Sequence, residues 1–489
     1  MLSKGTSRRR FLKAGAMLAG AGVLAACQQA ATPQVIEKVV EKEVTTIVEG
    51  TPQVVKETVV VKETVVVEKE KAPEGPVFIV YATQYSAPPH NTADDVLIAQ
   101  FEEQNPGIAV KKTTWPGQDI HDKLRLLATA GDLPDVFNIE TKQCVDMISR
   151  NMILDITDLF NTESGLTKDD YWPGEWEKQW FQGKMYLLSL DTQDVILYYN
   201  KDLFDAKGIP YPPKNWDDPD WTYDRLVEIG TQLAEGEGAS RIWGYETSRW
   251  WVYSYPVIWS YGGLVTNEDR TESRMTMPET IAALQARADW ITKWRISPTP
   301  AEVTEGVTNL FTGGRLAMRA IWNPFMWYIN EVEGLHFDIA AMPRGAAGAF
   351  TRCPQDTMAV GSQTKHPKEA FQVAMYVAGP VGQEEFDCKL GLGTPTLKAV
   401  AEKDSFIHPP VAGLEHIDQT LVLDCHRNGH YKHQDVTIKW PEMDKMISAE
   451  MDSLLDSNVT AEEFCKKLDP QITELLQSIP EEQRGWIGD

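Results

Sequence analysis

The chain has 489 residues, of which 71 are Asp or Glu and 47 are Lys or Arg, and its formal net charge at pH 7 is −24. A chain this acidic repels nucleic acid and anionic lipid head groups, so we exclude a function that depends on a basic surface. On a prior of roughly 150 residues per domain, the length predicts two to three domain-sized units behind any targeting segment.

The N-terminus has the pattern of an export signal. Three arginines at residues 8–10 precede a small, apolar run at 14–26, which ends in Leu-Ala-Ala before Cys27. The arginines with Phe-Leu behind them resemble a twin-arginine signal, and the end of the run resembles a lipobox. A membrane span is disfavoured because the run covers only about 20 Å as a helix, against a hydrocarbon core of roughly 30 Å. We therefore predict a twin-arginine lipoprotein signal over 1–26 and lipidation of Cys27.

Residues 27–76 have the composition of a low-complexity stalk. No aromatic residue occurs from Leu12 to Val77, so a packed core cannot begin before Phe78. A six-residue repeat of valine doublets and mixed charges runs through 54–71, and such a segment cannot bury itself without a partner. Because the repeat matches neither a heptad nor a strict alternation, a lipid-anchored, solvated stalk is favoured over a self-associating coiled coil or strand.

The body behind the stalk opens with alternating strand and helix patterns. The apolar run at 77–81 predicts a strand, and the spacing of acids and apolar residues from Asp94 to Phe101 predicts a helix that ends at Asn105-Pro106-Gly107. A strand at 108–110, a helix at 120–130 and a buried strand at 135–139 follow. This alternation is typical of a parallel α/β sheet.

Cysteine and histidine residues leave two questions open. Five cysteines remain in the body, with no Cys-x-x-Cys pair, and export to an oxidising compartment would permit a disulfide. Cys425, His426, His430 and His433 are four potential zinc ligands within nine residues. The loop is also rich in polar residues, so polar surface is the favoured interpretation. The sequence predicts no metal and no cofactor.

A series of short motifs resembles one known family. Ala130-Gly131-Asp132-Leu133-Pro134-Asp135 and Asn200-Lys201-Asp202-Leu203-Phe204 are followed by Phe311-Thr312-Gly313-Gly314-Arg315 and Gly393-Thr394-Pro395. Their order resembles that of the family 1 extracellular solute-binding proteins of ABC transporters. The stretch Pro212-Pro213-Lys214-Asn215-Trp216 also matches, with Asn215 in place of Thr. The resemblance covers roughly residues 77–480.

The resemblance implies an α/β, two-lobe periplasmic-binding-protein (Venus-flytrap) fold of class II type, in which each lobe is a mixed sheet flanked by helices. The chain would cross between lobes more than once, with the first lobe at 77–157 plus 355–391 and the second at 158–354 plus 392–489. The ligand would lie in the cleft between the lobes, near strand ends and helix N-termini.

Ligand contacts on the first lobe are expected just past the carboxyl ends of strands, where ligands bind in open α/β sheets. The residues at these strand ends are Thr83, Gln84, Tyr85, Trp115, Glu140 and Thr141. Gln355 and Asp356, where the chain is expected to return to the first lobe, are added as candidates.

On the second lobe the candidates are aromatic, because sugars present flat C–H patches to aromatic rings. The resemblance implies cleft contacts for Trp250, Trp251 and Trp440. The family usually shows Gly-x-Trp after Ala317-Met318, but this chain has Ile321-Trp322-Asn323-Pro324 with Trp327 farther on. Trp322, Asn323 and Trp327 are therefore added as candidates.

The sequence favours a binding protein over an enzyme, because the nucleophile, zinc-protease and phosphate-loop motifs are all missing from it. We expect a monomeric, membrane-tethered, extracytoplasmic subunit of an ABC importer that captures a carbohydrate and delivers it to a permease with a separate ATPase. Its membrane contact would be the Cys27 lipid alone, and it would bind no nucleic acid. The alternatives are a binding protein for a glycerophosphodiester, polyamine or peptide, and a lipid-anchored glycoside hydrolase.

Overall fold

The computed structural model describes residues 34–48, 51–65, 75–86, 88–115, 119–303 and 306–485. The chain separates into two compact units, Met1–Gly75 and Pro76–Asp489. The predicted signal and Cys27 lie outside the described residues. Over the part of the chain that is described, no helix combines the length and apolar character that a bilayer crossing requires.

The described part of the first unit contains two paired strands. Strand β1 (Gln34–Val48) pairs with β2 (Thr51–Val65) in antiparallel register, from Gln34 opposite Val65 to Val48 opposite Thr51. The segment for which a solvated stalk was favoured therefore contains paired strands. The valine content of these segments is compatible with strand structure because valine has a high β-propensity. Its role as a membrane tether stays a prediction.

The second unit contains a six-stranded mixed sheet in the order β17-β8-β16-β5-β3-β4. Its strands are β3 (Val77–Thr83), β4 (Ile108–Thr114), β5 (Val136–Glu140), β8 (Leu187–Thr192), β16 (Gln355–Val360) and β17 (Thr394–Pro395). Strand β3 is parallel to β4 and β5, whereas β16 is antiparallel to both β5 and β8. The predicted strands at the start of the body are confirmed, and so is their parallel arrangement.

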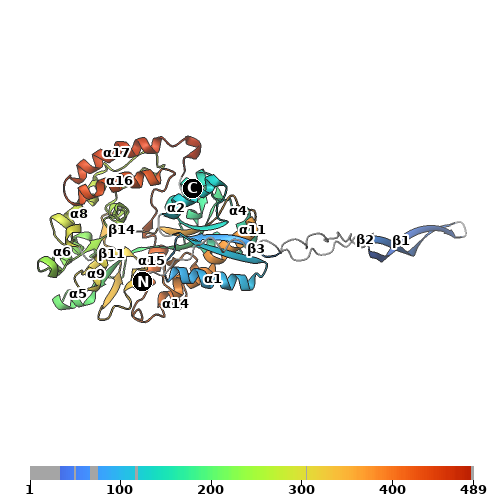
Figure 1. Ribbon diagram of the computed structural model, residues 1–489, viewed down its shortest axis with the longest axis horizontal. Helices are drawn as coiled ribbons and strands as arrows, with labels where there is room; N and C mark the ends of the chain where they lie inside the picture. The colour runs from blue at the N-terminus through green and yellow to red at the C-terminus, as the bar shows by residue number, and fades with distance from the viewer. Residues whose placement is uncertain are drawn as a thin grey trace, which may run out of the picture. The chain divides into compact units, whose positions relative to one another are not determined.

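Helices cover both faces of this sheet (Figure 1). On one face, α1 (His90–Gln104) and α11 (Pro367–Ala378) pack over Ile79 and Tyr81 of β3. On the other face, α2 (Asp119–Ala130) and α3 (Thr141–Ser149) pack over Ala82. Both faces are apolar because neighbouring residues of a strand point to opposite sides and each side meets a helix layer.

A second, four-stranded sheet has the order β10-β11-β9-β12. Its strands are β9 (Val195–Asn200), β10 (Glu246–Thr247), β11 (Met318–Trp322) and β12 (Phe337–Ala340). The longer helices around it are α5 (Lys201–Lys207), α6 (Tyr223–Leu233), α7 (Tyr255–Tyr261), α8 (Pro278–Thr292), α16 (Trp440–Leu455) and α17 (Ala461–Gln477). Helices α16 and α17 lie side by side, with α8 packed against both (Figure 1).

The sheet pairing corrects the expected lobe bounds. Strands β8 and β17 were expected in the second lobe, but both belong to the six-stranded sheet. The side chains of Tyr171 and Trp172 also lie in the core on that sheet's α1 and α11 face. The expected bounds are therefore wrong for these segments, because a resemblance in motif order does not show which strands share hydrogen bonds.

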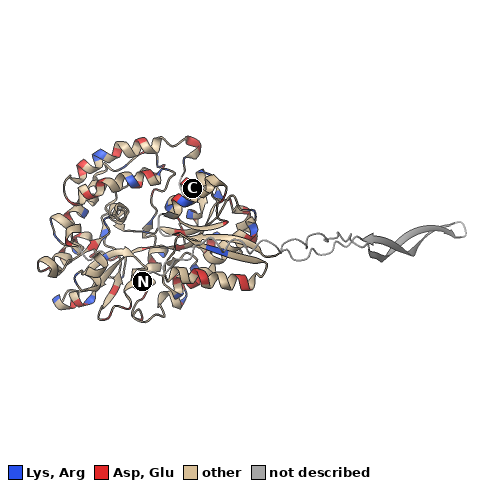
Figure 2. Cartoon of the chain, viewed as in Figure 1, with Lys and Arg blue, Asp and Glu red and all other residues tan. Residues whose placement is uncertain are grey.

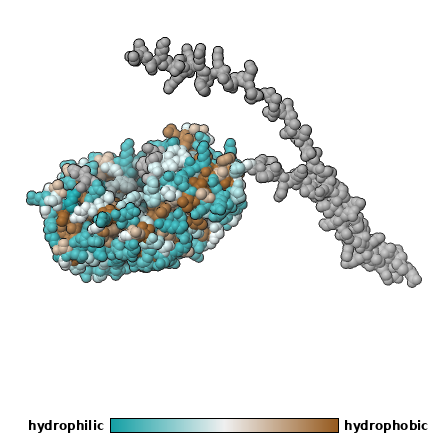
Figure 3. Space-filling model, turned by 60° about the horizontal axis from the view of Figure 1, so that its bottom comes forward, coloured by the Kyte–Doolittle hydropathy of each residue, from teal (hydrophilic) through white to brown (hydrophobic). Residues whose placement is uncertain are grey.

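The surface agrees with the acidic composition. Lys and Arg are interspersed with Asp and Glu along the helices of the body (Figure 2). The face of the body seen in Figure 3 is mostly hydrophilic, with scattered apolar residues. A net negative balance with interspersed charges favours solubility.

Candidate ligand-binding site

A cavity of about 580 Å³ lies between elements of the two sheets. Its volume falls within the range of small-molecule binding pockets. The side chains that line it come from the ends of β3, β5 and β11, the starts of α3 and β16, and the loops beside β10 and β15 (Thr351–Arg352). The cavity therefore lies where the sequence predicted a ligand, at strand ends of an open α/β sheet.

The six-stranded sheet contributes the acidic side of the cavity. Strands β5 and β16 are antiparallel, with Asp356 directly opposite Glu140, so the end of one strand and the start of the other present two carboxylates together. Tyr85, beyond the end of β3, donates a hydrogen bond from its hydroxyl to Asp356 Oδ2. Glu140 also forms an ion pair with Lys142. These pairings hold the polar groups in place before any ligand binds.

Burial changes the protonation of Asp356. Desolvation, together with the negative charge of Glu140, raises the pKa of Asp356 to about 7. Burial and the charge of Asp356 also raise the pKa values of Asp191 and Asp387 well above their usual range. Burial lowers the pKa of His90, whose ring stacks on Tyr85 at 4.2 Å, to about 4. Near neutral pH, Asp356 can therefore act as a hydrogen-bond donor or as an acceptor, and His90 is neutral.

The second sheet and its helices contribute aromatic faces. Trp322 ends β11, and Tyr328 lies on the short helix α10 (Phe325–Ile329), with their ring centroids 5.2 Å apart and an interplanar angle of 80°. Trp250 and Tyr253 follow from the segment after β10, and Lys142 Nζ lies 4.6 Å from the centroid of the Trp250 ring. Such rings offer broad apolar contact, and those of Trp and Tyr also carry a polar group.

Basic groups complete the lining, and most are paired. Arg319 Nε lies 3.1 Å from Glu246 Oε2, and both side chains are nearly buried. Arg249 Nη2 contacts Asp452 at 2.8 Å. Arg352 donates from Nη2 to Gln434 Oε1 at 2.9 Å, and its guanidinium carbon lies 5.6 Å from the centroid of the Tyr253 ring. Burial lowers the pKa of Arg352, although the residue stays charged near neutral pH.

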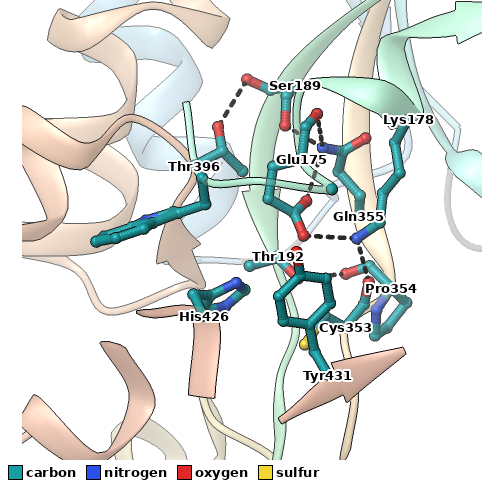
Figure 4. Close-up of polar contacts among 12 residues, drawn as sticks. Glu175, Lys178, Ser189, Thr192, Cys353, Pro354, Gln355, Thr396, His426 and Tyr431 are labelled. Atoms are coloured by element: carbon teal, nitrogen blue, oxygen red, sulfur yellow. Dashed lines mark hydrogen bonds and ion pairs between the residues drawn. The ribbon is translucent and has the colours of Figure 1, made fainter. Parts of the chain in front are cut away.

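A buried polar network surrounds Gln355, which is one of the lining residues (Figure 4). Gln355 Nε2 donates to Glu175 Oε2 at 2.9 Å, and it also donates to Ser189 Oγ. Lys178 Nζ donates to Glu175 Oε1 at 2.7 Å and to the carbonyl oxygen of Cys353 at 2.6 Å. This network fixes the strand that carries Asp356 into the cavity.

The structure brings part of the predicted set together. The predicted residues that line the cavity are Tyr85, Glu140, Thr141, Trp250, Trp322, Gln355 and Asp356. Sequence reasoning missed most of the ionisable residues of the lining, namely His90, Lys142, Glu246, Arg249, Arg319 and Arg352. The one available signal was position, because Lys142 directly follows the predicted Glu140 and Thr141. Arg319 gave no such signal, since it lies in β11, whose other residues are apolar and predict a buried strand.

Trp251 and Trp440, which were predicted to contact a ligand, do not line the cavity. Trp440 is 1% exposed and Trp251 is 2% exposed, and their ring centroids are 5.4 Å apart. Trp251 Nε1 donates to Asp444 Oδ1 at 2.6 Å. Both rings belong to the core under α16, because the apolar stripe of that helix needs large partners.

The other predicted contacts also lie outside the lining. Thr83 is fully buried, and the backbone N–H of Gln84 donates to Asn138 Oδ1 at 2.8 Å. Trp115 packs under Lys123, whose Nζ is 4.3 Å from the ring centroid.

Asn323 and Trp327, expected beside Trp322, have structural partners instead. Asn323 Nδ2 donates to Thr394 Oγ1 at 2.9 Å. Trp327 packs so closely on Gly391 that a Cβ added there would lie 1.3 Å from Trp327 Cε2. Strand position alone does not distinguish these inward-packed side chains from those that reach the cavity.

Two α/β lobes around one lined cavity define the periplasmic-binding-protein fold, as predicted. The model of the bacterial extracellular solute-binding protein family matches residues 87–384, and the chain belongs to this family. It is therefore an extracellular solute-binding protein.

Individual relatives agree with this assignment. A protein of Brucella abortus (strain 2308) that is described as a binding protein is 28% identical over 313 residues, which is 63% of this chain and 73% of the relative. An ABC substrate-binding protein of Listeria monocytogenes, solved with cycloalternan, has a TM-score of 0.72 at 20% identity, covering 82% of this chain and 98% of that one. UgpB of Mycobacterium tuberculosis, solved with glycerophosphocholine, has a TM-score of 0.67 at 20% identity, with the same coverage. At these identities the structural likeness concerns the fold.

Proposed function

We propose that this protein is the substrate-binding subunit of an ABC importer and that its ligand is a carbohydrate. The observation that carries the proposal is the composition of the cavity, in which the aromatic faces of Trp322 and Tyr328 lie with paired, planar polar groups. A sugar places C–H patches on aromatic rings and its hydroxyls on carboxylate, guanidinium and amide groups.

The charge balance of the cavity favours a neutral ligand. Lys142 is paired with Glu140, and Arg319 is paired with Glu246, so both cations already have counter-charges. A phosphodiester would have to compete with these carboxylates for the same donors, and it would add negative charge beside Asp356. A polyhydroxy ligand can accept from the donors and donate to the carboxylates without breaking either pair.

A glycerophosphodiester is the second candidate, because Arg352 offers a buried guanidinium. Among the described residues, no carboxylate lies within ion-pairing distance of Arg352, whose side chain is instead bonded to Gln434. The complex of the similar Mycobacterium tuberculosis protein with glycerophosphocholine gives the same alternative. The solved Listeria monocytogenes complex with cycloalternan supports the carbohydrate.

In the proposed cycle, the lobes close over the sugar and the closed form docks on a permease driven by a separate ATPase. The body would be tethered outside the cytoplasm by the lipid on Cys27, after cleavage of the twin-arginine signal. It acts as a monomer and does not turn its ligand over. Binding therefore supplies specificity, and the energy for transport comes from the partner.

Thermal unfolding of the full-length chain tests the ligand class. The panel contains mono- and oligosaccharides, glycerophosphodiesters, polyamines and peptides. A ligand at about 100 times its Kd adds roughly 2.7 kcal/mol, which for a body of roughly 400 residues raises Tm by about 3 °C. We expect one sugar to give this shift and Trp322→Ala to abolish it. The matched control is Trp294→Ala, which removes an exposed tryptophan that lies two residues beyond the end of α8 and does not line the cavity.

Three results would count against the proposal. A shift with glycerophosphodiesters alone would assign the second candidate. A sugar-induced shift that survives Trp322→Ala would remove the aromatic site. Release of a cleaved product from any glycoside in the panel would show a hydrolase, for which the neighbouring carboxylates of Glu140 and Asp356 would be the first candidates.

A further inference from the structure

Two of the segments that carry the chain between the lobes lie next to each other. Strand β8 of the first sheet continues into β9 of the second through Gln193 and Asp194. Strand β15 leads back into β16 of the first sheet through Cys353 and Pro354. The backbone N–H of Gln193 donates to the Pro354 carbonyl oxygen at 2.8 Å, so the two crossovers are hydrogen-bonded where they pass between the lobes.

Four side chains with metal-ligating atoms converge at these crossovers. They are Asp194 and Cys353 from the two crossovers, and Cys425 and His426 from helix α15 (Thr420–Arg427). One carboxylate oxygen, two thiol sulfurs and one imidazole nitrogen all lie within 4.8 Å of one another, and all four residues are buried. His426 Nε2 is 3.1 Å from Asp194 Oδ1 and 3.2 Å from Oδ2.

We propose that Asp194, Cys353, Cys425 and His426 form a structural Zn²⁺ site that ties these two crossovers to α15. Two thiolates, one imidazole and one carboxylate are a donor set that zinc prefers, and a site with four protein ligands is closed to substrate. Zinc bonds of about 2.0–2.3 Å place the ligands of a tetrahedron roughly 3.3–3.8 Å apart. The largest separation within the cluster, 4.8 Å, exceeds that range by about 1 Å.

The set differs from the one that the sequence suggested. His430 stacks on Trp216 with ring centroids 5.4 Å apart, and its Nδ1 lies 3.1 Å from the Ala349 carbonyl oxygen. His433 packs against Tyr431 at 5.2 Å. Neither histidine belongs to the cluster. The remaining two ligands come from positions far away in the sequence, which no local motif could indicate.

The surroundings hold the ligands in place. The ring of His426 lies between Trp172 and Tyr431, with centroid distances of 6.1 and 5.2 Å. Lys178 donates to the carbonyl oxygen of Cys353 and fixes the backbone at that ligand (Figure 4). Such supporting contacts orient ligands before a metal binds. A bound ion would therefore stiffen the connection on which the lobes turn, whatever solute the cavity takes.

Metal analysis of the full-length chain tests the site. The protein is expressed with zinc in the medium, purified without chelator under reducing conditions, and measured for zinc per chain. A second sample is refolded with Co²⁺ and examined by X-ray absorption. We expect one metal per chain, with two sulfur ligands at about 2.3 Å and two nitrogen or oxygen ligands at about 2.0–2.2 Å. The absorption measurement uses the wild-type chain, so it does not depend on the folding of a variant.

Variants identify the ligands. Cys425→Ser and Cys353→Ser should each lower the metal content to well under half, whereas Cys388→Ser should leave it unchanged. Cys388 is a matched control because it is also a buried, free cysteine, and its thiol donates to the Val400 carbonyl oxygen, away from the cluster. Three results would overturn the proposal: no metal in the wild-type chain, equal loss in Cys388→Ser, or a Cys353–Cys425 disulfide in the exported protein.

Discussion

The buried ion pair between Glu175 and Lys178 gives the sharpest prediction about stability. The Lys178 side chain is 6% exposed and that of Glu175 is fully buried, and Nζ lies 2.7 Å from Oε1. Lys178→Met removes the cation and leaves the carboxylate in the core with Gln355 as its remaining side-chain donor. Removing one partner of a buried pair costs about 3–5 kcal/mol, because the other charge stays desolvated.

The expected change is measurable by two methods. The compact unit Pro76–Asp489 has roughly 400 residues, so its unfolding entropy near 60 °C is about 0.9 kcal/mol/K and Tm should fall by about 3–6 °C. Urea titration at pH 7 gives the change in the free energy of unfolding directly. The matched control is Lys293→Met, because Lys293 is exposed and its Nζ lies 3.9 Å from Asp289; its loss should cost under about 0.5 kcal/mol.

A double variant separates charge from packing. Glu175→Gln combined with Lys178→Met should recover part of the loss, because a neutral amide costs less to bury than an unpaired carboxylate. The reasoning is refuted if Lys178→Met lies within about 1 kcal/mol of the wild type, as the control does. That result would mean that water reaches Glu175 when the lysine is removed.

Three further predictions concern Asp356, Trp440 and Gly391. Burial and the charge of Glu140 raise the pKa of Asp356 to about 7, so the folded chain keeps a proton that the unfolded chain loses above about pH 4. Because the folded chain binds the extra proton, the contribution of Asp356 to the free energy of unfolding falls as the pH rises from about 4 to 7. Asp356→Asn should flatten that slope in urea titrations at pH 5 and pH 7.5, and an unchanged slope would contradict the assignment. Trp440→Ala should cost about 3–5 kcal/mol in the same titration while the folded fraction keeps its affinity for ligand, since the ring is 1% exposed; a specific loss of affinity would return it to the site. Gly391→Ala should lower the free energy of unfolding by more than about 1 kcal/mol, because φ is +60° and the new Cβ would lie 1.3 Å from Trp327 Cε2. The displaced ring should also alter tryptophan fluorescence. A variant with native fluorescence and stability would show that the ring moves at no cost.

Much of the fold was accessible from local pattern. The strands at 77–81 and 108–110 and the helix at 120–130 were predicted from runs and spacings of apolar residues, and β3, β4 and α2 confirm them. These signals are readable because each element buries a face whose period is written in consecutive residues. The order of motifs then identified the family, although it misplaced β8 and β17.

Only about half of the candidate site residues could be predicted from the sequence, and pairs of neighbouring residues show why. Trp250 and Trp251 are adjacent and of the same type, yet one lines the cavity and the other is in the core. Likewise Trp322 lines the cavity, whereas Asn323 beside it bonds Thr394. Whether a side chain lines the cavity or lies in the core depends on the local backbone conformation and on the residues packed around it. The residue type alone indicates neither of these.

The sequence by itself determined the export pattern, the α/β alternation and the family, because each of these depends on residues that are near one another in the chain. Only the tertiary structure decided which charges pair inside the cavity. It also brought together Asp194, Cys353 and Cys425, which come from three distant segments. The physical reason is that such a site needs side-chain atoms within a few ångströms of one another, and only the packing of the two sheets across their crossovers sets those distances.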